Sequence, residues 1–259
     1  MSGAQSILRA IQLLKYFDDD NPTWDLAALT DTSGLNKTTV FRIIGALESE
    51  GLIERTTSGA YRLGSEMIAL GGRAARANDL RRVANTHLTT LTETTGETTT
   101  LEVMRQDGDQ GWSMLVIDEV LGKHLVGITQ YIGSRLPVYA TSTGKAVLAF
   151  TPSAADYLDD ELRTPVNPHL ISRQIFLQSL ADVRQDGYAL ALGELEPGLV
   201  AIGAPVFDAD GDVQAAISLV GPSVRIDEAK AHALATEVHE TATRISYQIG
   251  YRVSVPLKA

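Results

Sequence analysis

Apolar residues in the segment 37–50 recur at i, i+3, i+4 and i+7, which predicts an amphipathic helix with one buried stripe. The stripe is formed by Val40, Ile43, Ile44 and Leu47. The opposite face carries small or basic residues, namely Thr38, Arg42, Gly45 and Ser49. Because this face has no long apolar side chain, it can approach a sugar-phosphate backbone closely and offer a guanidinium and hydroxyl groups to bases and phosphates.

The neighbouring residues predict a helix-turn-helix followed by a two-stranded wing. A shorter helix over Asp25–Thr32 leads to Gly34, which permits a sharp corner, and Asn36 stands where an N-cap is expected. Two short strands, Leu52–Thr56 and Ala60–Leu63, flank a Ser-Gly hairpin turn. This order of elements is typical of proteins that place one helix in a DNA groove.

An earlier helix over Ser6–Phe17 is expected to close the small core with a stripe formed by Ile7, Ala10, Ile11 and Leu14. Winged helices also serve as protein–protein adaptors, and spacing alone leaves that alternative open. For DNA binding, the expected contacts come from the N-terminus and outer face of the second helix and from the wing. They are Asn36, Lys37, Thr38, Thr39, Phe41, Arg42, Arg55, Tyr61 and Arg62.

The charge balance limits how strongly one copy of this module can bind DNA. Residues 1–76 contain 8 Lys and Arg against 9 Asp and Glu, so the module is nearly neutral. Few phosphate contacts per copy imply that affinity depends on duplication of the module in a homo-oligomer. Of the net charge of −10, −9 lies on residues 77–259, so the larger part of the chain is not the nucleic-acid surface.

The hydrophobic periods beyond residue 79 predict an α+β domain built on an antiparallel sheet flanked by helices. The predicted strands are Thr98–Met104, Trp112–Asp118, Val126–Gln130, Leu199–Phe207 and Val213–Val220. The predicted helices run from Leu80 to just before Gly96 and over Gly144–Phe150, Ala154–Leu162, Ser172–Asp186 and Asp227–Gly250. We therefore expect a winged helix-turn-helix at 1–65, a linker helix at 66–79 and this domain at 80–259.

Composition argues against an enzyme. The chain has no Cys, which excludes disulfides, thiol catalysis and Cys-ligated zinc, and its five His are scattered. The Gly144-Lys145 pair lacks the first glycine and the Ser or Thr of a P-loop, because Tyr139 and Ala146 occupy those positions. The sequence predicts no catalytic set, metal site or cofactor. Without a signal peptide or membrane span, a cytoplasmic protein that does not contact the membrane is expected.

Segments of both domains resemble the IclR family of bacterial transcriptional regulators. SILRAIQLLKYF, LAALTDTSGLNKTTVFRIIGALESEGLI and YRLG are similar to its DNA-binding part, and Gly133–Phe150 and Asp186–Pro222 to its effector domain. The resemblance covers nearly the whole chain. It implies a winged helix-turn-helix, a linker helix and a GAF-like effector-binding and oligomerisation domain, in homodimers or homotetramers that bind double-stranded operator DNA as repressor or activator. An enzyme or a scaffold carrying a winged helix is the alternative.

The start of the helix near Gly144 is the candidate effector site. Ser142, Thr143 and the first helix amides would form a polar nest suited to a carboxylate, or would only cap the helix. The resemblance places the effector between this loop and the sheet. The candidate contacts are Leu125, Ile128, Leu136, Ser142, Thr143, Gly144, Ala191, Ala201, Ser218 and Val220.

Residues 191–193 depart from the pattern of the family. Many members carry acids where this chain has Ala191, Leu192 and Gly193, while Glu194 and Glu196 remain. Loss of an acidic residue should make the pocket more apolar and more favourable for an anionic ligand. The GELEPGL segment (Gly193–Leu199) also resembles that of members that sense aromatic acids, so the resemblance implies a small organic or aromatic acid as the effector.

Overall fold

The chain divides into two units in the computed structural model, Met1–Ala77 and Asn78–Ala259. The structure describes residues 3–18, 20–106, 111–124, 132–158, 162 and 172–252. The boundary falls after the helix α4 (Ser65–Ala77), which therefore belongs to the first unit by its contacts. Each unit is described by itself.

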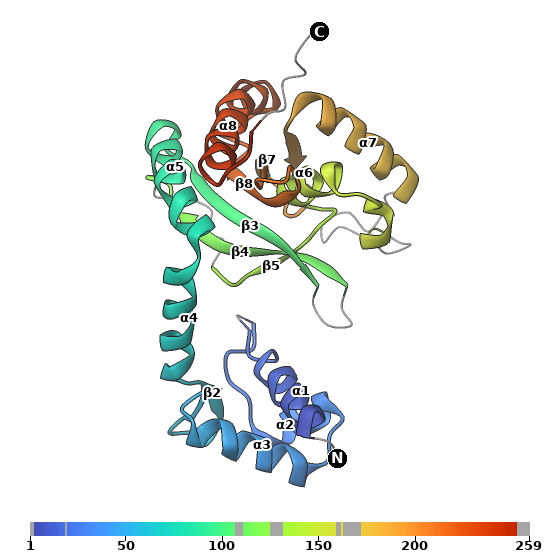
Figure 1. The fold of residues 1–259 in the computed structure, drawn as a ribbon. Helices are drawn as coiled ribbons and strands as arrows, with labels where there is room; N and C mark the ends of the chain where they lie inside the picture. Colours follow the sequence, from blue (N-terminus) through green and yellow to red (C-terminus); the bar gives the residue numbers. More distant parts are fainter. Residues whose placement is uncertain are drawn as a thin grey trace. The chain divides into compact units, whose positions relative to one another are not determined.

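The first unit contains the predicted helix-turn-helix and wing (Figure 1). Its elements are α1 (Gly3–Leu14), α2 (Leu26–Ser33), α3 (Lys37–Ser49), β1 (Ile53–Arg55), β2 (Tyr61–Leu63) and α4. The Asp25 side chain caps α2 by accepting a hydrogen bond from the Ala28 N–H, and Gly34 ends that helix in the left-handed region at φ 64°. Strands β1 and β2 pair antiparallel, with Ile53 opposite Leu63.

Helix α1 packs through a different face from the predicted one. Ile7 and Ile11 are 62% and 47% exposed, whereas Leu13 and Phe17 are buried in the core of the unit. The reason is that Ala10, Leu13 and Leu14 form a second stripe at i, i+3 and i+4, and Phe17 follows the end of α1 into the same core. The prediction for Ile7 and Ile11 was therefore wrong, and these side chains are left on the surface.

The second unit is the predicted α+β domain. Its strands are β3 (Thr98–Gln106), β4 (Trp112–Val120), β5 (Arg135–Pro137), β6 (Ala189–Leu192), β7 (Leu199–Phe207) and β8 (Val213–Pro222), in the sheet order β5-β4-β3-β8-β7-β6. Every neighbouring pair in this sheet is antiparallel. Its helices are α5 (Asp79–Thr95), α6 (Ser142–Phe150), the 3₁₀ helix η2 (Ala154–Tyr157), α7 (Arg173–Asp186) and α8 (Glu228–Gln248).

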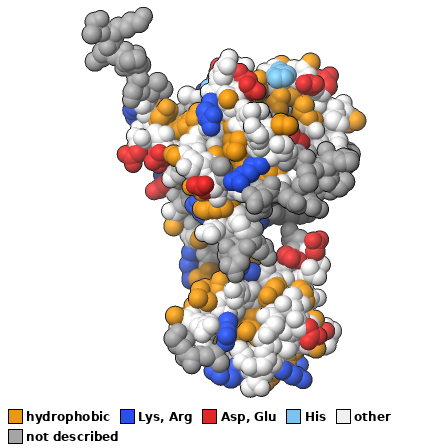
Figure 2. Space-filling view, turned by 90° about the vertical axis from the view of Figure 1, so that its right-hand side faces the viewer, with side chains coloured by type: hydrophobic (Ala, Val, Ile, Leu, Met, Phe, Trp, Pro, Cys, Tyr) orange, Lys and Arg blue, Asp and Glu red, His pale blue; other side chains and the backbone are white. Residues whose placement is uncertain are grey.

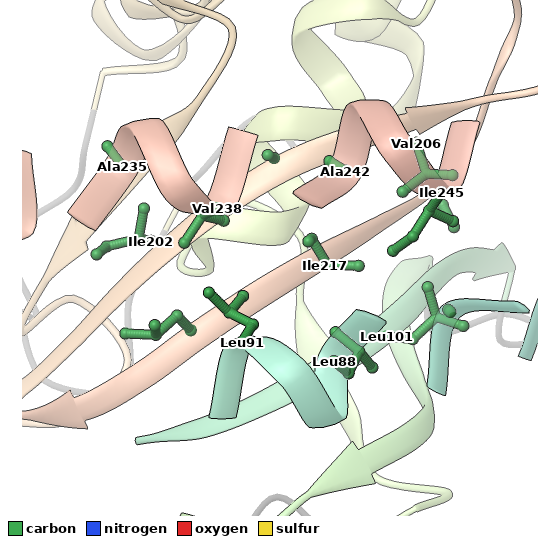
Figure 3. Close-up of a cluster of buried hydrophobic side chains, with 14 of the residues drawn as sticks. Leu88, Leu91, Leu101, Ile202, Val206, Ile217, Ala235, Val238, Ala242 and Ile245 are labelled. Atoms are coloured by element: carbon green, nitrogen blue, oxygen red, sulfur yellow. The ribbon is translucent and has the colours of Figure 1, made fainter. Parts of the chain in front are cut away.

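Helices cover both faces of this sheet. One hydrophobic cluster joins α5 and α8 to one face, and a second joins α6 and α7 to the other (Figure 1). Figure 3 shows the first cluster, with Val238 and Ile245 of α8 above Ile202 and Ile217 of the strands. Because side chains alternate along a strand, the neighbours of these inward residues point to the opposite face, toward α6.

The structure differs from the prediction in several elements. The described part of Ala154–Leu162 contains the short helix η2, and the strands β5 and β6 were not predicted because they have only three and four residues. Helix α6 begins two residues before the predicted Gly144. The predicted strand Val126–Gln130 lies outside the described residues. Within the described ranges, no helix combines the length and apolar character that crossing a membrane requires.

Candidate functional site

Helix α3 presents its polar face to the surface of the first unit. Val40, Ile44 and Leu47 are buried, whereas Lys37, Thr38, Phe41, Arg42 and Gly45 are exposed. Figure 2 shows Lys and Arg side chains along the lower edge of this unit. The apolar stripe of α3 thus holds the helix on the core while the opposite face remains available to a nucleic acid.

The N-terminus of α3 is capped as predicted. The Asn36 side chain accepts a hydrogen bond from the Thr39 N–H at 2.8 Å. This cap satisfies one of the first-turn donors and fixes where the helix begins. A phosphate at this end would meet the remaining first-turn amides together with Lys37.

On the wing, the arginines predicted to contact DNA are exposed and the tyrosine is buried. Arg55 and Arg62 are exposed, and Arg62 lies 3.2 Å from the Glu54 carboxylate. Hydrogen bonds from Ser65 and Arg62 lower the pKa of Glu54. Tyr61 is only 5% exposed and packs in the core, with the Arg55 guanidinium 5.7 Å from its ring centre. Alternation along β2 turns Tyr61 inward and Arg62 outward, so the structure does not place Tyr61 on the surface with the other predicted DNA contacts.

In the second unit, a small cavity lies between the first turn of α6 and the sheet. Most of the predicted effector contacts among the described residues line it, namely Leu136, Ser142, Thr143, Ala191, Ala201 and Ser218. The other lining residues are Glu102, Ala140, Thr141, Glu194, Leu195 and Leu199. The cavity encloses about 10 Å³, close to what one water molecule needs, so an organic ligand requires the lining to move apart.

Strand register explains why distant residues meet at this cavity. Thr100 of β3 lies opposite Ser218 of β8, Ser218 lies opposite Gly203 of β7, and Ala201 lies opposite Ala191 of β6. Gly203 permits the first turn of α6 to lie on the sheet, because a Cβ there would be 2.5 Å from the Ser142 carbonyl carbon. The glycine thus fixes the distance between α6 and the strands.

Two predicted contacts are not part of the cavity wall. A Cβ at Gly144 would lie 1.9 Å from the Val138 carbonyl oxygen, and the Gly144 N–H donates to the Thr141 hydroxyl at 3.1 Å. Gly144 therefore serves close packing, and the residue that caps α6 is Thr141. Val220 is 1% exposed and packs in a small cluster beside the wall. Leu125 and Ile128 lie outside the described residues.

Sequence reasoning missed Glu102 of β3. This residue is 1% exposed, accepts a hydrogen bond from Thr143 at 2.6 Å and another from Thr100 at 2.8 Å, and burial raises the pKa of its carboxyl group. The available signal was a charged residue inside the otherwise buried strand 98–104. Its neighbour Thr143 is distant in sequence, so the contact could not be read from spacing.

A second carboxylate, Glu194, also lines the cavity and forms an ion pair with Lys145. The Lys145 ammonium also donates to the Leu190 carbonyl oxygen at 3.0 Å. Residues 191–193 carry no acid, but Glu102 from β3 adds a carboxylate to the cavity wall. Among the described residues, no group of three or more His, Asp or Glu side chains is placed to hold a metal ion.

Comparisons with known proteins agree along the length of the chain. The family model of the IclR helix-turn-helix domain matches residues 6–57, and that of the bacterial transcriptional regulator IclR C-terminal domain matches residues 72–247. The chain is 31% identical to the HTH-type transcriptional regulator XynR of Escherichia coli (strain K12), over 95% of this chain and 98% of the relative. It is 30% identical to the glycerol operon regulatory protein of Streptomyces griseus, over 95% and 96%.

A solved structure agrees with the fold. The crystal structure of an IclR transcriptional regulator from Alicyclobacillus acidocaldarius superimposes with a TM-score of 0.84 at 27% identity. The match covers 95% of this chain and 99% of that chain. The similarity therefore includes both units and not only the helix-turn-helix.

Proposed function

The chain belongs to the IclR family of bacterial transcriptional regulators, and we propose that it binds double-stranded operator DNA as a homo-oligomer controlled by a small organic or aromatic acid. Its relatives are transcriptional regulators, which confirms the prediction that the chain is not an enzyme. In the proposal the protein acts in the cytoplasm, and α4 links the DNA-binding unit to the effector unit.

The exposed face of α3 is the observation that supports DNA contact most directly. Thr38 and Arg42 lie on this face, one helical turn apart, and Lys37 stands beside the capped N-terminus. A guanidinium and a hydroxyl group at this spacing can reach base edges and phosphates in a major groove. Arg55 and Arg62 of the wing would add backbone contacts.

Exposed apolar side chains on α1 and α4 support a homo-oligomer. Ile7 and Leu8 of α1 are 62% and 61% exposed, and Ile68 and Leu70 of α4 are 79% and 45% exposed. Each of the two helices thus carries large apolar side chains that a partner surface could cover. Because the near-neutral DNA-binding unit needs duplication for useful affinity, we assign these side chains to contact with a second copy of the chain.

The cavity beneath α6 supports control by a small acid. Leu136, Ala191 and Ala201 provide apolar walls, and the hydroxyl groups of Ser142 and Ser218 provide polar contacts. The first turn of a helix carries partial positive charge, which favours a carboxylate. A ligand that opens this cavity would bind one conformation better than another, as effector control requires.

The test is an electrophoretic mobility shift with a duplex from the region upstream of the chain's own coding sequence. At fixed salt, we predict that Arg42→Ala weakens operator binding by about 1–3 kcal/mol, because a base-edge or phosphate contact is lost. Arg244→Ala, which removes the same charge from an exposed position on α8, is the matched control and should bind normally. Unchanged binding by Arg42→Ala would remove α3 from the interface.

A further inference from the structure

The effector cavity has a buried carboxylate in its wall. Glu102 lies on the face of β3 that points toward α6, and its side chain is enclosed by hydroxyl groups. Thr100 donates to one carboxylate oxygen at 2.8 Å and Thr143 to the other at 2.6 Å. Thr100 also shares a hydrogen bond with Ser218 at 2.8 Å, so the network reaches β8.

The Glu102 carboxylate accepts fewer hydrogen bonds than it can. A carboxylate can accept about four hydrogen bonds, and the threonines supply only a part of that number. Within the described part of the chain, Glu102 forms no ion pair. The ammonium of Lys145, the nearby cation, is held by Glu194 and the Leu190 carbonyl oxygen.

The incomplete hydrogen bonding of Glu102 determines which ligand groups the cavity favours. A buried carboxylate that has no counter-charge and only part of the donors it can accept is costly, so a ligand that supplies a further donor offsets part of that cost. Thr143, which could have donated to an effector carboxylate, already donates to Glu102. Beside Thr143 the cavity therefore favours a group that donates hydrogen bonds and disfavours an anion.

The rest of the wall suits the other parts of a small acid. Ser142 has no side-chain hydrogen bond to another described residue, so its hydroxyl group is available to a ligand carboxylate. Leu136 and Leu199 are apolar neighbours for a carbon skeleton. The donor site at Glu102 and the acid site at Ser142 are therefore separate parts of one cavity.

We propose that Glu102 is a specificity-determining residue, which accepts a hydrogen bond from a hydroxyl or amino group of the effector. This inference rests on the proposed function. It narrows the effector class from small acids in general to hydroxy acids and amino acids. An acid with the same skeleton but no hydroxyl or amino group supplies no further donor to the buried carboxylate. A site built to bind a polar group discriminates strongly against an analogue that lacks the group.

The test measures ligand dissociation constants for the full-length protein by calorimetry, with compounds that share a skeleton. One series is 3-phenylpropanoate, 3-phenyllactate and phenylalanine, and the other is propanoate, lactate and alanine. Phenethylamine and 2-phenylethanol carry a donor without an acid. The variants are Glu102→Ala and Glu102→Gln, and Glu196→Gln, which alters an exposed carboxylate on the neighbouring loop, is the control.

The wild-type protein and the control should bind a hydroxy acid or amino acid at least about tenfold more tightly than the plain acid. Glu102→Ala should abolish that preference. Glu102→Gln keeps an acceptor oxygen without the charge, so it should retain preference for a hydroxy acid but lose preference for an amino acid. The glutamine variant thereby shows whether the cavity recognises a hydroxyl or an amino group. It also keeps the test valid if the alanine variant does not fold.

The outcomes separate this inference from the proposed function. Equal binding of plain and substituted acids, or a preference that survives in Glu102→Ala, would overturn the role of Glu102 while leaving an acid effector in place. Binding of phenethylamine or 2-phenylethanol as tight as that of the substituted acids, and lost in Glu102→Ala, would support Glu102 and overturn the acid effector.

Discussion

Glu102 illustrates how one residue can change the chemistry expected of a site. Its carboxyl group is enclosed by Thr100 and Thr143, which come from β3 and α6. Desolvation in this environment raises the pKa of the group. A titratable side chain perturbed in this way and placed in a cavity is a candidate for function, and here it also makes stability depend on pH.

The pH dependence has a definite sign. Because burial raises the folded-state pKa of Glu102 above its ordinary value of 4.5, the folded state binds the proton more tightly than the unfolded state does. Its contribution to stability is therefore present below about pH 4.5 and is lost as pH rises through the folded-state pKa. Glu102→Gln removes this titration. We predict that the free energy of unfolding of the wild type, minus that of Glu102→Gln, decreases as pH rises from 4.5.

Urea unfolding of both proteins at a series of pH values measures this difference. All other ionisable groups are common to both proteins, so their contributions to the pH dependence cancel in the comparison. A difference that stays constant or increases with pH would show that Glu102 is not a buried carboxyl group of raised pKa.

At the scale of elements, the sequence predicted the features that depend on neighbouring residues, such as helix stripes and helix caps. The stripe of α3 is buried at Val40, Ile44 and Leu47, and Asn36 forms the predicted cap. The predictions failed where tertiary packing chooses between equivalent local patterns, as on α1, where Leu13 and not Ile11 faces the core. Contacts across the sheet, such as that between Glu102 and Thr143, depend on strand register and could not be obtained from spacing.

The glycines of the helix-turn-helix provide a test of its backbone. Gly45 lies in the interior of α3, exposed, and a Cβ there would have no atom within 4 Å. We predict that Gly45→Ala raises the free energy of unfolding by about 0.5–1 kcal/mol, because the unfolded chain loses conformational freedom and the helix gains propensity. Gly34→Ala should do the opposite, since Gly34 has a φ of +64°.

Urea unfolding of the two variants beside the wild type measures both effects. If Gly45→Ala were destabilising, residue 45 would not lie on an unobstructed helix face, and the exposed surface assigned to α3 would be incorrect.

At the scale of the whole molecule, function in the proposal depends on pairing of identical chains. Ile7 on α1 and Ile68 on α4 are exposed apolar side chains of the DNA-binding unit. A charge placed in a buried interface costs several kcal/mol unless it is paired. We predict that Ile7→Glu and Ile68→Glu each lower the oligomeric mass at micromolar concentration, measured by size-exclusion chromatography with light scattering, and weaken operator binding in parallel.

Ile175→Glu is the matched control, because Ile175 on α7 is 64% exposed in the other unit. It should leave the mass and operator binding of the wild type unchanged. If both test variants kept the wild-type mass, the apolar faces of α1 and α4 would not form the interface between copies.

In the proposed function, a ligand in the cavity beneath α6 controls the binding of α3 to DNA. The most direct test is operator affinity by fluorescence anisotropy at fixed salt, with and without the acid that binds the wild-type protein most tightly. The wild-type affinity should change by about 5–150-fold, the range expected of allosteric coupling. Ser142→Leu fills the cavity and keeps the hydrogen bond from Thr143 to Glu102, so this variant should bind the operator normally and not respond. An equal response in Ser142→Leu would contradict control through this cavity.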